Sequence, residues 1–318
     1  AFEKGVSKLE RDSEVVVGKY LQNLQEQILS LDFYDIKFEE KLSRLRIDNR
    51  ENTQNMIKKI HKSGMEKGGK ETQDNIMRRV RQRSFKPLTK LDPMADEIAL
   101  QYAFEFDMDD SRIQTIINNR SDTVQALMDE TTYRKVSEKI NDGIVNGESV
   151  EEVASKIADT GLFDIKRARM IARTETVSSL NAGHIEASRQ SGVVKGKRWL
   201  TALDGNERES HARASGQERK LDELFDLDME QVQAPAMGSE PSENLNCRCT
   251  MIEILDTDRM SRSVEADVQK FVYPINEARC PKCKKLLAKK VSGIAYIWCQ
   301  RCKHELKFNS ETGKSAII

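Results

Sequence analysis

The stretch that decides how this chain folds is RARMIARTETVSSLNAGHIEA, residues 167–187. Its pattern predicts a helix over about 164–191 that carries the polar residues Arg173, Thr174, Glu175 and Asn181 among apolar ones. Arg173 and Glu175 are two positions apart, so on a helix they point to different sides and cannot pair with each other. We therefore expect a structural polar site, in which Arg173, Glu175 and Asn181 each hold another part of the protein, such as a strand end or a loop backbone.

After this helix, the spacing of apolar residues is no longer helical. VVKGKRWLTAL (193–203) predicts a strand, and CTMIEIL (249–255) predicts its partner. The connection between them is polar and rich in glycine and proline, and a connection of that length needs an internal anchor. One hypothesis is a zinc site built from Asp204, His211, Cys247 and Cys249. The alternative is that both cysteines are buried thiols and that His211 bonds to the backbone.

These segments, taken in order, resemble the phage Mu F-like minor head protein family. The similarity covers about residues 110–255, and its matching pieces are Ile171 to Thr176, Asn181, Lys197 with Trp199, Asp204 with Arg208 and His211, Gly216, and Asn246 to Cys249. The resemblance implies a minor structural protein of a tailed-phage head, not an enzyme. It also implies association with the portal and the capsid or procapsid, and a location in the virion, with the host cytoplasm as the place of assembly.

Length and composition narrow the class further. A chain of 318 residues predicts two or three domains. The 52 basic and 52 acidic residues cancel, which excludes a globally basic nucleic-acid binder and leaves only local patches. No apolar run reaches about 18 residues and the first residues do not resemble a signal peptide, so no membrane association is expected.

The N-terminal region is charged and helical in pattern. An apolar seam repeats at Val17, Leu21, Leu24, Ile28 and Leu31, and a second helix is predicted over 38–63, followed by a hinge at Gly64, Gly68 and Gly69. Either the two helices bury the seam between them, or they form an arm that docks on the portal or on a sister copy. We expect an assembly element, with self-association as a further option. Further helices are predicted over about 95–106, 109–131, 133–146 and 149–159, the last with a capping box at Ser149 and Glu152.

Two CxxC pairs mark a separate C-terminal module. Cys280 and Cys283 are followed, after fifteen residues, by Cys299 and Cys302. This spacing predicts one zinc ion held by four thiolates, and a module of about 30 residues has too little core to fold without such a clamp. All six cysteines lie after residue 246, so metal binding is favoured over the alternative of disulfides. We therefore expect one zinc ion per chain in this ribbon, and a second one if the His211 cluster also binds metal.

Basic and aromatic residues suggest weak, non-specific contact with DNA. The alternatives are that the first basic cluster is a solvated helix end and that the two aromatics cover the zinc site. The module also resembles the Com-like zinc modules of phages, small regulators that bind RNA. The candidate nucleic-acid residues are Lys284, Lys285, Lys289, Lys290, Tyr296, Trp298 and Arg301 in the module, and Arg78, Arg79, Arg81 and Arg83 before it.

The sequence thus predicts a helix-rich α+β protein. The expected order is a helical arm or hairpin over 1–92, a Mu F-like domain with a small sheet over 93–256, a helical connector over 257–276, a zinc ribbon over 277–309 and a tail over 310–318. Two other functions stay open. One is a phage-delivered enzyme using Arg173, Glu175 and His211, because Arg-Thr-Glu is similar to the Arg-Ser-Glu triads of ADP-ribosyltransferases. The other is an RNA-binding regulator.

Overall fold

A computed structural model describes residues 2–83, 104–202 and 205–256, and in the C-terminal part residues 278–279, 282, 286–288, 294–309 and 314–317. The chain divides into two units, Ala1–Asp256 and Thr257–Ile318, which we describe separately. The predicted helix-rich α+β class is confirmed. The connector 257–276 and the predicted ligands Cys280, Cys283 and Asp204 lie outside the described residues.

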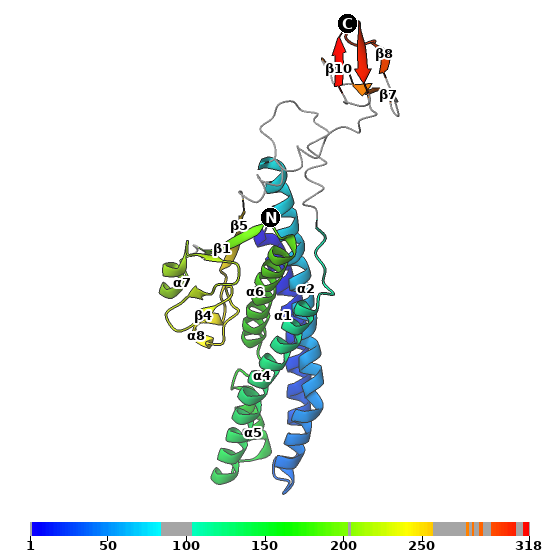
Figure 1. The fold of residues 1–318 in the computed structure, drawn as a ribbon. Coiled ribbons are helices and arrows are strands. Elements are labelled where there is room, and N and C mark those ends of the chain that lie inside the picture. The colour runs from blue at the N-terminus through cyan, green and yellow to red at the C-terminus, as the bar shows by residue number, and fades with distance from the viewer. Residues whose placement is uncertain are drawn as a thin grey trace. The chain divides into compact units, whose positions relative to one another are not determined.

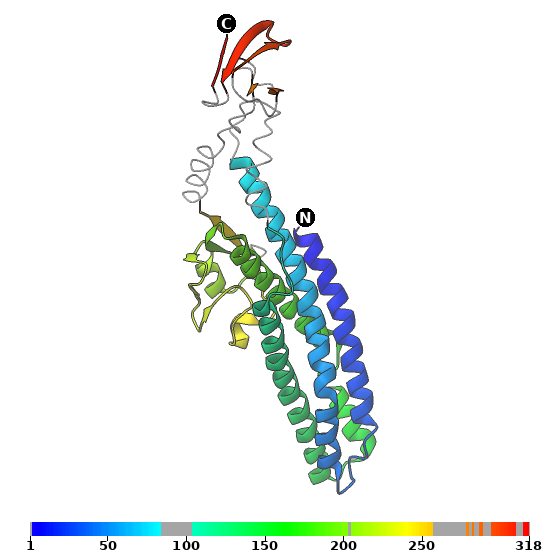
Figure 2. The same ribbon diagram turned by 45° about the vertical axis from the view of Figure 1, so that its right-hand side comes forward.

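Long helices dominate the first unit (Figures 1 and 2). They are α1 (Phe2–Leu29), α2 (Phe38–Arg83), α4 (Ser111–Asn146), α5 (Val150–Ala158) and α6 (Ile165–Ser191). The helix predicted from the 167–187 stretch is therefore confirmed as α6, which lies against both α1 and α2. Two predicted helices, 109–131 and 133–146, are one continuous helix, because the buried Thr132 and Tyr133 continue the core-facing side of α4 without a break.

The apolar seam of α1 is buried inside this unit. Val17, Leu21, Leu24 and Ile28 are at most 3% exposed, in a core that also contains Ile57 of α2 and Ala168 of α6. The prediction that the seam forms a protruding arm is therefore wrong. Its apolar side chains are covered by α2 and α6, and residues of the expected 1–92 region and the Mu F-like region share one core.

The glycines expected to form a hinge lie within a continuous helix, so that prediction is also wrong. Gly64 and Gly68 face α6, where an added Cβ would lie 1.8 Å from Ser179 Oγ and 2.3 Å from the Leu180 carbonyl oxygen. A Cβ on Gly183 of α6 would in turn lie 2.3 Å from the Met65 carbonyl oxygen. These glycines let the backbones of α2 and α6 approach closely, which side chains would prevent.

Local signals in the sequence fix the helix ends. Asp110 caps α4 by accepting a hydrogen bond from the Arg112 amide, and Gly147 ends that helix in the left-handed conformation. The capping box of Ser149 and Glu152 at the start of α5 is confirmed, with both reciprocal hydrogen bonds present.

A small antiparallel sheet follows α6. β1 (Val194–Leu200) pairs with β5 (Thr250–Leu255) on one side and with β2 (Glu218–Lys220) on the other. The predicted pairing of the 193–203 and 249–255 segments is confirmed, with Trp199 opposite Met251. Besides β2, the described part of the connection between them contains only short elements, which are α7 (Glu209–Ala214), β3 (Phe225–Asp226), β4 (Gln231–Val232) and α8 (Pro241–Asn244). We call residues 201–249 the insertion.

The second unit is built from short strands. β8 (Ile294–Cys299), β9 (His304–Asn309) and β10 (Lys314–Ile317) form an antiparallel sheet, and β6 (Ala278–Arg279) pairs with β7 (Leu286–Ala288). Its described core is small, with Ala278, Cys299 and Phe308 fully buried. Among the described helices of the whole chain, none has the length and apolar character needed to cross a membrane.

Candidate functional site

Four consecutive residues of α6, Arg173 to Thr176, all contact other parts of the first unit. Arg173 lies 3.6 Å from Glu10 of α1, and Thr176 bonds to Ser13 of the same helix. The Thr174 hydroxyl accepts a hydrogen bond from the Asn246 amide at 3.0 Å, and Glu175 contacts α2 and α4. Arg173 and Glu175 therefore hold separate partners, which are helices and not the strand end or loop backbone that we expected.

Glu175 is the centre of a buried ionic cluster. It is 4% exposed, accepts two hydrogen bonds of 2.8 Å from the Arg120 guanidinium, and lies 2.9 Å from Nε2 of the buried His61. Burial by itself would raise the pKa of Glu175, but the charge of Arg120 and the hydrogen bonds from His61 and Arg120 lower that pKa to about 2. The carboxylate is therefore ionised near neutral pH and joins α2, α4 and α6 at one point.

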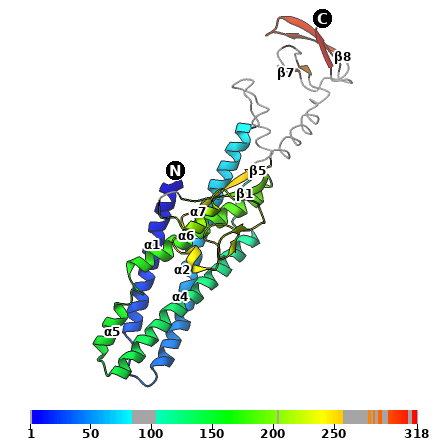
Figure 3. The same cartoon turned by 90° about the vertical axis from the view of Figure 1, so that its left-hand side faces the viewer.

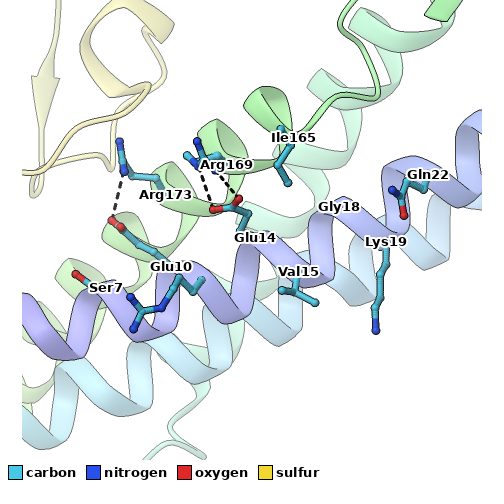
Figure 4. A pocket seen from close by; sticks show the side chains of 11 residues that line it. Ser7, Glu10, Glu14, Val15, Gly18, Lys19, Gln22, Ile165, Arg169 and Arg173 are labelled. Atoms are coloured by element: carbon cyan, nitrogen blue, oxygen red, sulfur yellow. Dashed lines mark hydrogen bonds and ion pairs between the residues drawn. The ribbon is translucent and has the colours of Figure 1, made fainter.

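Arg173 lines an open groove of about 680 Å³ between α1 and α6, shown in Figure 4. In the groove, Arg169 donates two hydrogen bonds to Glu14, and Arg173 faces Glu10. Burial raises the pKa of Glu10, and the neighbouring Arg173 opposes that rise. The two pairs fix α1 along α6.

Asn181 ties α6 to the insertion at two points, an interior residue and its C-terminal end. Its amide nitrogen donates to the carbonyl oxygens of Pro235 at 3.0 Å and of Cys249 at 3.2 Å, and its oxygen accepts from the Thr250 hydroxyl. The Asn181 side chain is buried, so the bonds to the two carbonyl oxygens are shielded from water. A buried amide with this many partners orients the start of β5 relative to the helix.

His211, Cys247 and Cys249 come together although 36 and 38 residues separate the histidine from the two cysteines. Their ligating atoms lie within 4.8 Å of one another, and all three side chains are buried. His211 belongs to α7, and the cysteines precede β5. Hydrogen bonding within the pair, together with burial, raises the pKa of Cys247, while the hydrogen bond from Cys247 lowers the pKa of Cys249.

Lys197 and Trp199 of β1 support this cluster from the sheet. The Trp199 ring is fully buried and meets the His211 ring edge-on, with 5.4 Å between centroids. Lys197 donates a 2.7 Å hydrogen bond to the Gln233 carbonyl and lies over the Phe225 ring. Burial lowers the pKa of this lysine to about 8. Lys197 and Trp199 therefore pack against the insertion and hold it on the sheet.

Some of the candidate nucleic-acid residues are exposed, and others bond within the fold. Arg79 donates to the backbone and carboxylate of Glu253, so it joins α2 to β5 and is wrongly assigned to a free basic patch. Arg78 is exposed and bonds to Asn75, whereas the side chains of Arg81 and Arg83 are not described.

In the second unit, Tyr296 and Trp298 are 62% and 54% exposed, so neither is buried against a zinc site. Arg301 is also exposed, and Lys284, Lys285, Lys289 and Lys290 lie outside the described residues.

A match to a known protein family covers the polar residues of α6. Residues 134–252 match the Phage Mu protein F like family. This Mu F-like segment begins within α4 and ends within β5, and it contains the four polar residues 173–176, Asn181 and the His211 cluster. The partners His61 and Arg120 lie outside the matched segment, in helices that precede it.

Several known proteins resemble this chain over part of their length. A minor head protein, GP7, of Bacillus phage SPP1 is 30% identical over 120 residues, which are 37% of this chain and 39% of that protein. The uncharacterized protein YqbB of Bacillus subtilis is 28% identical over 47% of this chain and 50% of its own length. An Enterococcus faecalis protein named NAD(+)–arginine ADP-ribosyltransferase EFV is 33% identical over 39% of this chain and 26% of its own length.

The chain therefore spans about a quarter to a half of these relatives. No solved structure matches it significantly. The family match and the SPP1 minor head protein point to a structural protein of a phage head. The residues considered for an enzyme each serve different partners: Arg173 faces α1, Glu175 faces Arg120 and His61, and His211 faces the cysteines.

Pattern reasoning missed the residues that complete these sites. His61, Arg120, Glu243 and Glu253 are distant in sequence from the residues that they contact. His61 sits in a charged stretch and has no motif around it. Only one signal could have identified these residues. It is an acidic or basic residue at a position where the pattern of apolar residues predicts the core.

Proposed function

We propose that this protein is a minor structural component of a tailed-phage head that associates with the portal and the procapsid during assembly. The match of residues 134–252 to the Mu F-like family carries the proposal, and the similarity to the SPP1 minor head protein supports it. The polar residues of the matched segment are used to pin helices, sheet and insertion together. Function then comes from surfaces that the pinned fold presents.

One end of the helical bundle offers such a surface. The α1–α2 turn and the α4–α5 turn lie side by side there, joined by a hydrogen bond from the Tyr34 hydroxyl to the Glu148 carbonyl (Figures 1 and 3). Ile36 is fully exposed at this end, and Val145 is 84% exposed. We call the exposed apolar residues here the apolar tip: Ile36, Ile144, Val145 and Val150. Burying such side chains against a partner stabilises a complex by about 25 cal/mol per Å².

Charge substitutions in the apolar tip test this role. Ile36→Asp with Val145→Asp should reduce incorporation into procapsids at least about tenfold, because charged groups at the centre of an interface cost about 2 kcal/mol or more. The measurement is the amount of the chain in purified heads assembled with and without portal protein. Leu127→Asp is the control, because Leu127 is an exposed apolar residue of α4, 49% accessible, that lies about 27 Å along the helix from Val145. If the tip variant is incorporated as well as the wild type, the docking surface lies elsewhere on the protein.

For the second unit, we propose weak contact with nucleic acid. Tyr296 and Trp298 are exposed on β8, and Tyr296 pairs across the sheet with Lys307. Exposed aromatic rings beside cations provide stacking and phosphate contacts. We also propose that Cys299 and Cys302 act with Cys280 and Cys283 to hold one zinc ion. This proposal rests on the spacing of the four cysteines and on the small core of this unit.

Alanine substitutions at the exposed aromatic residues of β8 test the proposed contact with nucleic acid. Trp298→Ala and Tyr296→Ala should each weaken binding to a single-stranded oligonucleotide by about 1–3 kcal/mol, measured by fluorescence anisotropy. Replacing Lys284, Lys285, Lys289 and Lys290 with Glu should weaken it further, and wild-type affinity should fall steeply with salt. Met229→Ala, an exposed apolar residue of the first unit, is the control. Binding that is insensitive to salt and to both aromatic substitutions would exclude this surface, and a strong preference for one RNA sequence would favour a regulator.

A further inference from the structure

The insertion has little regular structure of its own, and one cluster of side chains fastens its two ends. His211 lies ten residues into the insertion, and Cys247 and Cys249 close it. Between these ends, the only described helices and strands are short, none longer than the six residues of α7. A fixed link between α7 and the start of β5 therefore defines the path of the whole segment.

The sequence around the cysteines directs both sulfurs to one side. Asn246 adopts a positive φ of 57°, a conformation that asparagine tolerates, and its amide is held by Thr174 of α6. After it, Cys247 and Cys249 are buried, whereas Arg248 between them is exposed. This alternation is that of extended backbone, in which residues two apart share a face. Both thiols consequently face the His211 ring.

The distances in the cluster are those of a metal site. Nδ1 of His211 lies 3.4 Å from the Cys249 sulfur and 3.8 Å from the Cys247 sulfur. In a tetrahedral zinc site with bonds of about 2.3 Å to sulfur and about 2.1 Å to nitrogen, nitrogen and sulfur are separated by roughly 3.6 Å. The two observed distances lie on either side of that value, and all three ligating atoms lie within 4.8 Å of one another, as the ligands of one ion must.

The surroundings prepare His211 to be a ligand. Its other nitrogen, Nε2, lies 3.1 Å from the buried carboxylate of Glu243, which itself accepts a hydrogen bond from Ser210. A carboxylate beside Nε2 favours the tautomer with the proton there, and so leaves the Nδ1 lone pair facing the sulfurs.

We propose that His211, Cys247 and Cys249 bind one zinc ion that clamps the insertion, with Glu243 as a positioning residue. Two thiolates and one imidazole form a donor set suited to zinc. The fourth coordination position would be filled by an oxygen ligand such as water. Binding releases the thiol protons and leaves the sulfurs as ligands, so the site needs no oxidant. This ion is additional to the one proposed for the C-terminal cysteines, and it does not depend on the role in phage heads.

The experiment uses the full chain with all four C-terminal cysteines replaced by serine, which leaves the first unit unaltered: Cys280→Ser, Cys283→Ser, Cys299→Ser and Cys302→Ser. Titration with Co²⁺ should then give sulfur-to-cobalt charge-transfer absorption that saturates at one equivalent, and Zn²⁺ should displace the cobalt. Adding Cys247→Ser and Cys249→Ser should abolish this absorption. Because the informative protein keeps His211, Cys247 and Cys249 intact, misfolding of a site variant cannot produce the expected result.

Two other outcomes would overturn the proposal. One is the absence of charge-transfer absorption in the folded protein that lacks the four C-terminal thiols, with Cys247 and Cys249 reacting as free thiols. The other is a Cys247–Cys249 disulfide in protein purified under reducing conditions. Glu243→Gln tests the positioning role: zinc affinity should fall about 10–100-fold while the cobalt spectrum keeps its sulfur bands. An unchanged affinity would show that Glu243 does not orient the ligand.

Discussion

Replacing Glu175 with alanine should destabilise the helical unit by about 3–5 kcal/mol, because the substitution leaves the Arg120 charge largely buried and without its partner. His61 would lose the same carboxylate, so α2, α4 and α6 would no longer be joined at this point. Urea unfolding monitored by circular dichroism measures the change. The control is Glu138→Ala, which removes an exposed ion pair with Arg134 within α4 and should cost no more than about 0.5 kcal/mol.

The same carboxylate gives the stability a defined pH dependence. The pKa of Glu175 is about 2 in the folded protein, well below the ordinary 4.5 of a glutamate, so unfolding takes up a proton as the pH falls. Its stabilising contribution is complete above about pH 4.5 and is lost as the pH falls from there towards 2. The stability difference between wild type and Glu175→Gln should shrink over that interval. A difference that stays constant between pH 5 and pH 3 would show that Glu175 is not stabilised as a carboxylate.

Replacing Gly183 with alanine should have the second large effect. The new methyl group would lie 2.3 Å from the Met65 carbonyl oxygen and 2.9 Å from the Gly69 nitrogen, which are backbone atoms of α2. The two helices would have to separate along their crossing, and overpacking of this kind costs about 1–3 kcal/mol or more. A fall in the midpoint of thermal unfolding measures the cost.

Gly18→Ala is the matched control for this substitution. Gly18 also lies within a helix, but an added Cβ would meet no atom within 4 Å. Alanine there should stabilise the protein by about 0.4–1 kcal/mol, since it restricts the unfolded chain. If both glycine substitutions had the same sign, the close approach of α2 and α6 would not be what requires Gly183.

Local patterns predicted much of this fold. The helix over 164–191, the capping box at Ser149 and the pairing of two strands around a long insertion depend on residues that are near each other or that follow a simple period. The spacing of Arg173 and Glu175 also indicated that they hold separate partners. Each of these features is set by backbone geometry, which the order of residues specifies directly.

The partners of those residues were decided by tertiary structure. No local pattern relates Glu175 to His61, 114 residues away. The donor chemistry of His211, Cys247 and Cys249 suggested a common site, but only the fold brings them together across 36 and 38 residues. The three glycines of α2 look like a hinge in sequence, because glycine weakens a helix in isolation. In the folded chain Gly64 and Gly68 permit a close crossing of α2 and α6, and Gly69 lies against the Phe106 ring. This packing outweighs the weakness. The sequence alone determined which segments are helices, strands and polar sites. Only the packing of α1, α2 and α4 around α6 decided what each polar side chain contacts, because those contacts join residues that no period relates.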